Sequence, residues 1–357
     1  MKKLLVVLFI LVGCLSANSS LFYKVHKGSK ALGYYEINYN DKKGYIKTKS
    51  YGVASKVKFF VNKDIKYMGD GYRQIVFKKN KDIRRFEIRT QKDKIDKSIL
   101  KQYRSLSTKL KKVKGNDMLL LTKEGKRGIE LFNKRATYLL TLEEVLKSII
   151  DNNIQKDFLL FEQLGVQKLK AKLKKTATGY DIINKSKQTK YIKIDVKNGI
   201  PVLVKSYVSD WSITIYGAGQ FKLKKVSLNE IKDKLLDDIR LKLAKYNDLS
   251  LKRIEKVKST KKAYIVYYRA KVTYPSDITD KKRYCNKAYK RVSKKASNIE
   301  YENGSCTVTL RADIKSKKVI DDFKSKLIAN YPQLKFTKKI KVSKKGAIMY
   351  KVIDRVN

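Results

Sequence analysis

The stretch "LFYKVHKGSKALGYYEINYNDKKGYIKTKSYGV" (Leu21–Val53) alternates apolar with polar residues and is broken by short glycine-containing clusters. Alternation with a period of two is typical of strands that have one buried and one solvent-facing side. Glycine within a short polar cluster, as in Asp41–Gly44, indicates a tight turn between two such strands. The stretch therefore predicts an antiparallel sheet whose lysines lie on the wet face.

The same alternation continues to about residue 122 and returns after residue 157, with one helical segment between. The segment opens with the capping box Thr141–Glu144 and places apolar residues at helical spacing. We expect a short helix near residues 141–152 that covers a sheet edge or the end of a barrel. Glu143 and Glu144 are expected on its surface, and neighbours on a helix do not face each other, which argues against a catalytic carboxylate pair.

Residues 20–226 thus predict a β-rich domain, built as an antiparallel curved sheet or as a lipocalin-like barrel. Large aromatic residues would fill the interior of such a barrel or line a site for a small apolar ligand. We favour filling of the core. The candidates for this interior are Tyr34, Tyr35, Phe59, Phe60, Tyr67, Phe77 and Trp211.

A second capping box, Ser227–Glu230, begins an amphipathic helix over residues 227–248 that connects or covers domains. Its apolar stripe comprises Leu228, Ile231, Leu235, Ile239 and Leu243. Strand and helix patterns then follow in the order β-α-β-α-β-β, which predicts a smaller α+β domain over residues 249–357. The whole chain is therefore expected to be α+β and rich in strands.

The motif "FYKVHKGSKALGYYEINY", the helix "TLEEVLKSII" and the later strands "NGIPVLVKSYVSDWSITIYGAG" occur in this order. In this arrangement residues Leu21–Lys225 resemble the DUF3108/DUF6134-type exported β-rich proteins of bacteria. The resemblance implies a curved sheet or lipocalin-like barrel with a short helix in the middle of the chain. It implies no catalytic residues, and the C-terminal part lies outside it.

The N-terminus has the layout of a secretory signal peptide over residues 1–19: a basic start, the apolar run Leu4–Val12 and a polar exit. The run is too short to span a bilayer. Leu11–Cys14 resembles a bacterial lipobox, in which Cys14 would receive a lipid and become the first residue of the mature chain. The next residue is Leu15. An aspartate at this position would retain the protein at the inner membrane, so the outer membrane remains a possible location for the protein. The alternative is ordinary cleavage after Ser19.

If Cys14 is removed with the leader, or carries a lipid, Cys285 and Cys306 are the two cysteines left with free thiols. An even pair in an exported protein predicts a disulfide, which would join the first helix of the C-terminal domain to its second strand. The alternative is two buried thiols. No metal or other cofactor is expected, because there is no Cys-x-x-Cys motif and His26 is the only histidine.

The charge is strongly basic, with 85 Lys and Arg against 33 Asp and Glu, for a net charge of +52. Only 14 of the 85 are arginines, although arginine predominates in contacts to bases and phosphates of nucleic acids. With an export signal we expect no nucleic acid partner. Anionic lipid, lipopolysaccharide or an envelope protein fits better. The alternative is a genome-wide bias toward lysine.

No nucleophile elbow or zinc-protease motif is present in the sequence, and we expect no enzymatic activity. The first hypothesis is a non-catalytic, periplasmic, membrane-anchored lipoprotein of the cell envelope that binds an amphipathic or anionic ligand such as lipid. The second is a structural or protein-interaction module that acts through the C-terminal α+β domain.

Overall fold

The computed structural model describes residues 19–54, 57–68, 73–79, 82–89, 116–123, 126–133, 138–162, 167–293 and 298–356. Cys14 and the other leader residues up to 18 lie outside these residues, whereas Ser19 lies within them. The chain divides into two compact units. The first comprises residues 1–221 and 353–357, and the second comprises residues 222–352. The chain therefore leaves the first unit after Phe221 and returns to it at Ile353.

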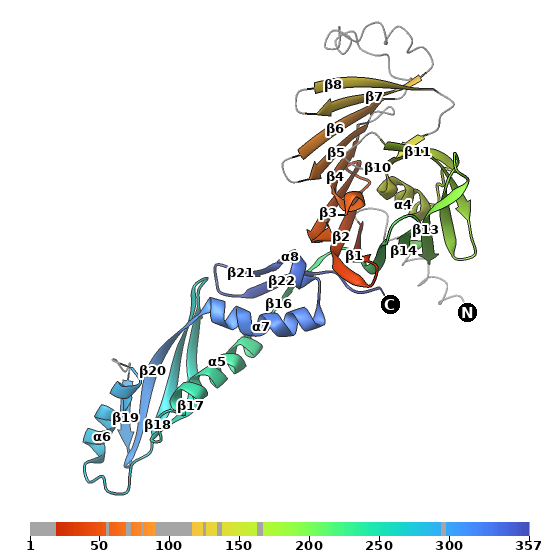
Figure 1. The fold of residues 1–357 in the computed structure, drawn as a ribbon. Coiled ribbons are helices and arrows are strands. Elements are labelled where there is room, and N and C mark those ends of the chain that lie inside the picture. Colours follow the sequence, from red (N-terminus) through yellow and green to blue (C-terminus); the bar gives the residue numbers. More distant parts are fainter. Residues whose placement is uncertain are drawn as a thin grey trace, which may run out of the picture. The chain divides into compact units, whose positions relative to one another are not determined.

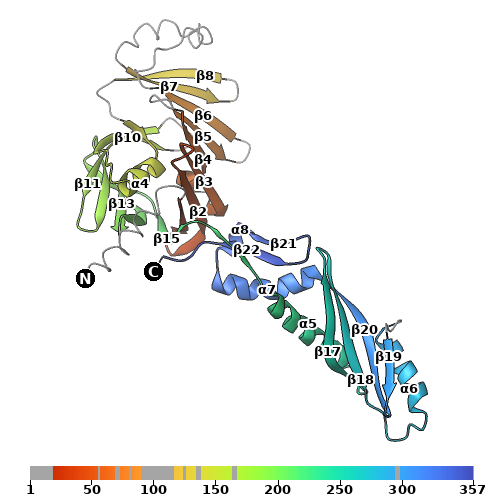
Figure 2. The same cartoon turned by 180° about the vertical axis from the view of Figure 1, so that it is seen from behind.

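The first unit is built on a single 15-stranded sheet (Figures 1 and 2). One half runs outward from its centre as consecutive antiparallel neighbours: β1 (Ser19–Lys27), β2 (Lys30–Asn40), β3 (Tyr45–Gly52), β4 (Asn62–Tyr67), β5 (Arg73–Lys79), β6 (Asp82–Arg89), β7 (Asn116–Lys123) and β8 (Lys126–Asn133). The 3-10 turn η2 (Lys58–Phe60) precedes β4. The alternating stretch Leu21–Val53 becomes β1, β2 and β3, as predicted.

The other half starts at β15, which pairs with β1. It comprises β9 (Tyr138–Leu140), β10 (Asp157–Glu162), β11 (Gln167–Lys175), β12 (Gly179–Asn184), β13 (Thr189–Lys197), β14 (Ile200–Ser206) and β15 (Trp211–Gly219). The short β9 pairs in parallel with β10, and helix α4 (Leu142–Ile150) connects these two strands. All other pairings in this half are antiparallel.

The predicted curved sheet is confirmed, whereas the lipocalin-like barrel is wrong. Strands β8 and β9 are the two edges of the sheet, and no described pairing joins them. The sheet curves so that α4 lies between its two halves (Figures 1 and 2). The apolar residues of this helix form part of the core that the curved sheet surrounds.

The second unit is α+β, as predicted. Its main sheet has the order β17-β18-β20-β19, and a smaller sheet has the order β16-β22-β21. The elements are β16 (Lys222–Lys225), α5 (Leu228–Leu243), β17 (Leu249–Ser259), β18 (Ala263–Val272), α6 (Lys281–Ala288), η4 (Tyr289–Arg291), β19 (Asn298–Glu302), β20 (Ser305–Lys315), α7 (Ser316–Asn330), α8 (Leu334–Thr337), β21 (Ile340–Val342) and β22 (Ile348–Val352).

The helices of this unit pack on one face of the main sheet. Ile231, Leu235, Ile239 and Leu243 of α5 are buried in one core with alternate residues of β18 and β20. Leu228, which we placed on the same stripe, is 55 % exposed at the helix start. The sulfur atoms of Cys285 in α6 and Cys306 in β20 lie at disulfide distance, with their Cα atoms 5.9 Å apart. The pair therefore joins the first helix to the strand that the sequence indicated.

Among the described residues, no helix has both the length and the apolar character needed to cross a bilayer.

Candidate functional site

Helix α4 and the sheet residues around it form the candidate site. The sequence begins the helix at this point because the Thr141 hydroxyl accepts a hydrogen bond from the Glu144 amide, while the Glu144 carboxylate accepts one from the Thr141 amide. This capping box satisfies two amide groups that the first turn leaves open. Leu142, Val145, Leu146 and Ile149 then face the core of the sheet. The helix carries its two glutamates into the same interior.

Glu143 is fully buried. Its Oε1 accepts hydrogen bonds from the Tyr35 hydroxyl at 2.6 Å and from Lys63 Nζ at 2.6 Å. Its other oxygen, Oε2, is buried with no hydrogen-bond partner among the described residues. A buried carboxylate is held in a fold only when it is paired, and one unsatisfied oxygen leaves a hydrogen-bond acceptor open in the core.

The ammonium group of Lys63 comes from β4 and is 4 % exposed. It also donates to the carbonyl of Phe59 at 2.9 Å, and it lies 6.0 Å from the ring centroid of Tyr35 and 5.9 Å from that of Phe77. Aromatic faces attract a cation, but they do not replace a counter-ion. The only full negative charge paired with this lysine in the described structure belongs to α4.

Glu144 forms a second buried cluster beside the first. Its Oε1 accepts from Arg73 Nη1 at 2.7 Å and from the Tyr67 hydroxyl at 2.9 Å. Arg73 begins β5 and is 14 % exposed. Two cations from adjacent strands thus meet two carboxylates at the N-terminal turn of one helix, where negative charge is also favoured by the helix dipole.

The phenols around these carboxylates stay protonated. Burial, and then the charge of Glu143, raises the pKa of Tyr35 well above its usual value. Burial raises the pKa of Tyr39 as well, and its hydroxyl donates to the Glu143 carbonyl at 3.2 Å. Burial, followed by Glu144, also raises the pKa of Tyr67. Neutral phenols serve as hydrogen-bond donors to the carboxylates here.

Five of the seven predicted interior residues lie in this core: Tyr35, Phe59, Phe60, Phe77 and Trp211. The Trp211 ring lies 4.7 Å from that of Phe59 and 5.1 Å from that of Phe60, measured between centroids. The indole nitrogen of Trp211 is buried without a hydrogen-bond partner among the described residues. These side chains pack on one another, as we favoured.

The prediction is wrong for Tyr34, because neighbours on a strand point to opposite faces and Tyr35 takes the inward one. Tyr34 stacks on Phe22 at 5.1 Å and meets Tyr216 edge-on at 5.5 Å, on the other face of the sheet. Burial, reinforced by Tyr216, raises its pKa to about 12. Tyr67 lies at the margin, since it is 40 % exposed while its hydroxyl reaches Glu144.

The expected surface position of Glu143 and Glu144 is also wrong, although the two carboxylates do face different partners. The sequence does carry a signal for the buried position of their partner Lys63. Val61, Lys63 and Ile65 occupy alternate positions of "VNKDIKY", so the period of two places the lysine on the buried face. Its carboxylate partner lies 80 residues away and could not be read from the pattern.

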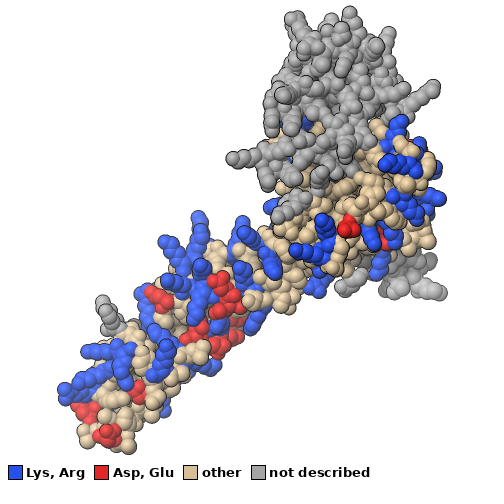
Figure 3. Space-filling view, viewed as in Figure 1, with Lys and Arg blue, Asp and Glu red and all other residues tan. Residues whose placement is uncertain are grey.

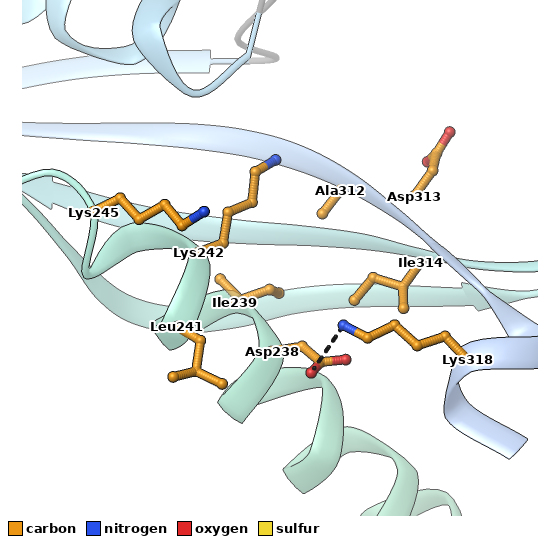
Figure 4. Close-up of a pocket in the computed structure, with 9 residues that line it drawn as sticks. All are labelled: Asp238, Ile239, Leu241, Lys242, Lys245, Ala312, Asp313, Ile314 and Lys318. Atoms are coloured by element: carbon orange, nitrogen blue, oxygen red, sulfur yellow. Dashed lines mark ion pairs between the residues drawn. The ribbon is translucent and has the colours of Figure 1, made fainter. Parts of the chain in front are cut away.

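The second unit contains a groove of about 360 Å³ between α5, the end of β20 and the start of α7 (Figure 4). Asp238 of α5 and Lys318 of α7 form an ion pair across it at 3.4 Å. Lys242 and Lys245 also line the groove. Lysine and arginine cover much of the visible described surface of each unit and do not gather on one element (Figure 3).

Within the described residues no cluster of histidine, cysteine, aspartate and glutamate could hold a metal ion. The chain matches no model of a known protein family, and a comparison with curated proteins finds no relative. The resemblance to exported β-rich proteins stays a prediction.

Proposed function

We propose that this protein is a non-catalytic, exported component of the bacterial cell envelope that binds an anionic amphipathic molecule, such as a lipid, on the inward face of its large sheet. The observation that supports this proposal is the pairing of Lys63 with Glu143. A buried ammonium group in an aromatic core receives its counter-charge from a separate short helix. A core that served only to stabilise the fold would gain more from apolar residues at both positions.

The proposed ligand would displace helix α4 from the core. The helix has the same chemical character as this ligand. One of its faces is apolar, through Leu142, Val145, Leu146 and Ile149, and its first turn carries two carboxylates. An acyl chain could replace the apolar face, and an anionic headgroup could replace the carboxylates against Lys63 and Arg73. Without such a replacement, movement of α4 would leave two cations uncompensated in an apolar environment, which is strongly unfavourable.

The net charge of +52 supports the same ligand class, because a basic protein is concentrated at membranes that contain anionic lipid. The leader over residues 1–19, with Cys14 as its lipidation site, supports export and a membrane anchor. A lipid anchor would hold the chain at the surface from which it takes its ligand.

Trp211 provides the test, since it is the only tryptophan in the chain and lies in this core. The full-length protein is titrated with a phosphatidylglycerol whose acyl chains carry bromine, which quenches tryptophan on contact. We expect saturable quenching, and weaker quenching by phosphatidylcholine with the same chains. A Lys63→Met/Arg73→Met variant should lose this headgroup preference. Binding of the lipid without quenching, or no binding, would contradict the proposal.

Export is tested separately by the intact mass of protein purified from its native membrane. A chain that begins at Cys14 and carries a lipid supports the anchored form. A chain that begins after Ser19 without lipid supports a free exported protein, and a retained leader would argue against export.

A further inference from the structure

We propose that the second unit binds an extended acidic peptide segment along strand β17, in the groove between this strand and helix α5. The segment would add one strand to the main sheet of the unit. This inference is independent of lipid binding by the first unit, because it uses other residues and another class of ligand.

Strand β17 is an edge of the main sheet. It pairs with β18 on one side, and no described strand pairs with its other side. Its 11 residues present a row of backbone donors and acceptors there. Such an edge is the usual place for an extended peptide to bind, since the main-chain hydrogen bonds supply affinity without regard to sequence.

A groove of about 480 Å³ runs beside this edge. The stripe of α5 from Asn229 to Arg240 forms one wall, about 16 Å long at the rise of an α-helix. Residues Lys252–Val257 of β17 form the other wall, which is about 17 Å long at the rise of a strand. The two walls match in length, and they would accommodate about five or six extended residues.

The residues that line the groove determine which side chains of a bound peptide would fit. Leu236, Ile254 and Val257 are half-buried and form an apolar floor. Lys232 and Lys256 line the rim, and neither forms an ion pair within the described structure. A peptide that alternates apolar and acidic residues could therefore place one set on the floor and the other against the lysines.

The acidic residues of the groove do not cancel this charge. Glu255 is held by two arginines, at 2.8 Å from Arg253 and 2.6 Å from Arg269. Asp233 also lines the groove, next to Lys232 in the sequence, and is exposed to solvent. The rim gains further positive charge from Lys252, whereas Arg240 is paired with Asp237 at 3.6 Å.

Lysines and bulges on an edge strand can also serve to keep other strands away, and β17 has two irregularities, at Leu251/Arg253 and Ile254/Lys256. Protection alone does not require an apolar floor beside the edge. It also predicts that no peptide binds, whereas our proposal predicts binding that depends on backbone hydrogen bonds.

The probe is a fluorescein-labelled hexapeptide of alternating glutamate and valine, and the measurement is fluorescence anisotropy with the full-length protein at about 0.15 M salt. We expect saturable binding. Two versions of the probe carry methyl groups on alternate backbone amides, each on one edge of the extended peptide. One version should lose binding and the other should keep it, because only one edge of the peptide meets β17.

The Lys232→Glu/Lys256→Glu variant should bind the probe about tenfold more weakly or worse. The matched control, Lys324→Glu/Lys326→Glu, makes the same change of charge on exposed positions of α7 and should bind as the unchanged protein does. Absence of binding would overturn the proposal. So would equal binding of hexaglutamate, or of both methylated probes, because charge attraction alone would then explain the result. The methylated probes use the unchanged protein, so this outcome does not depend on whether a variant folds.

Discussion

Lys63 Nζ and Glu143 Oε1 lie 2.6 Å apart in the interior of the first unit, although 80 residues separate them in the sequence. The side chain of Lys63 is 4 % exposed and that of Glu143 is 0 % exposed. This pair joins the first half of the large sheet to the helix that connects two strands of the second half, β9 and β10. The fold of the first unit and its proposed ligand site therefore depend on the same contact.

Removal of one partner of this pair should be costly. Lys63→Met leaves the Glu143 charge buried and unpaired, and we expect a loss of about 3–5 kcal/mol in the free energy of unfolding. Lys63→Met combined with Glu143→Leu should recover most of this loss, because neither charge of this pair then remains buried. Urea unfolding followed by Trp211 fluorescence reports on this unit alone.

The control for that prediction is Lys78→Met, which breaks the Lys78–Asp64 pair on the exposed side of the neighbouring strands. Lys78 is 46 % exposed, so we expect a change of less than about 1 kcal/mol. A Lys63→Met variant as stable as this control would show that the buried pair contributes little.

The capping box of α4 predicts a smaller effect. Thr141→Ala removes the hydroxyl that accepts from the Glu144 amide and should destabilise the first unit by about 1 kcal/mol. Because the Glu144 carboxylate is also positioned by this box, the same change should increase the quenching of Trp211 by brominated anionic lipid. Thr141→Ser keeps the acceptor and should behave as the unchanged protein in both measurements. Destabilisation without increased quenching would show that the helix cap does not control access of the ligand.

The disulfide should act on the second unit only. Cys285→Ala/Cys306→Ala opens a loop closed by residues 21 apart in sequence, for an expected loss of about 3 kcal/mol. Hydrogen exchange measured by mass spectrometry should show faster exchange in β18 and β20, with no change in β1 and β2. Equal acceleration in both units would mean that they unfold together, contrary to this prediction.

Alkaline pH should destabilise the first unit through its buried tyrosines. A tyrosine in the unfolded chain has a pKa of about 10, whereas burial raises that of Tyr34 to about 12 in the folded protein. The unfolded state therefore loses its proton first as the pH rises. The stability that this group contributes is fully present below pH 10 and is lost progressively between about pH 10 and 12.

Urea unfolding at a series of alkaline pH values tests this sign, with phenolate absorbance as a second readout. Tyr34→Phe should reduce the slope of stability against pH in this range. An unchanged slope would exclude Tyr34 as a contributor, and a rise in stability with pH would contradict the predicted direction.

Much of the fold could be predicted because its signals are local. The alternation over Leu21–Val53 gave three successive strands, and the capping boxes at Thr141 and Ser227 gave the starts of α4 and α5. Strand β17 was missed, since two bulges interrupt its alternation and four lysines and arginines dilute its apolar residues. The opposite faces of Tyr34 and Tyr35 follow from the period of a strand and were available in the sequence.

The sequence by itself determined which segments become strands and helices, because periodicity, caps and turn residues act over a few neighbouring positions. It also predicted a disulfide between Cys285 and Cys306, a pair whose sulfur atoms the structure places at disulfide distance. Only the tertiary structure decided that the sheet stays open around α4, and that Glu143 meets Lys63 in its interior. Sheet closure and the burial of a charge depend on which distant segments come together. The energy of such a pair is set by its surroundings and not by its place in the chain.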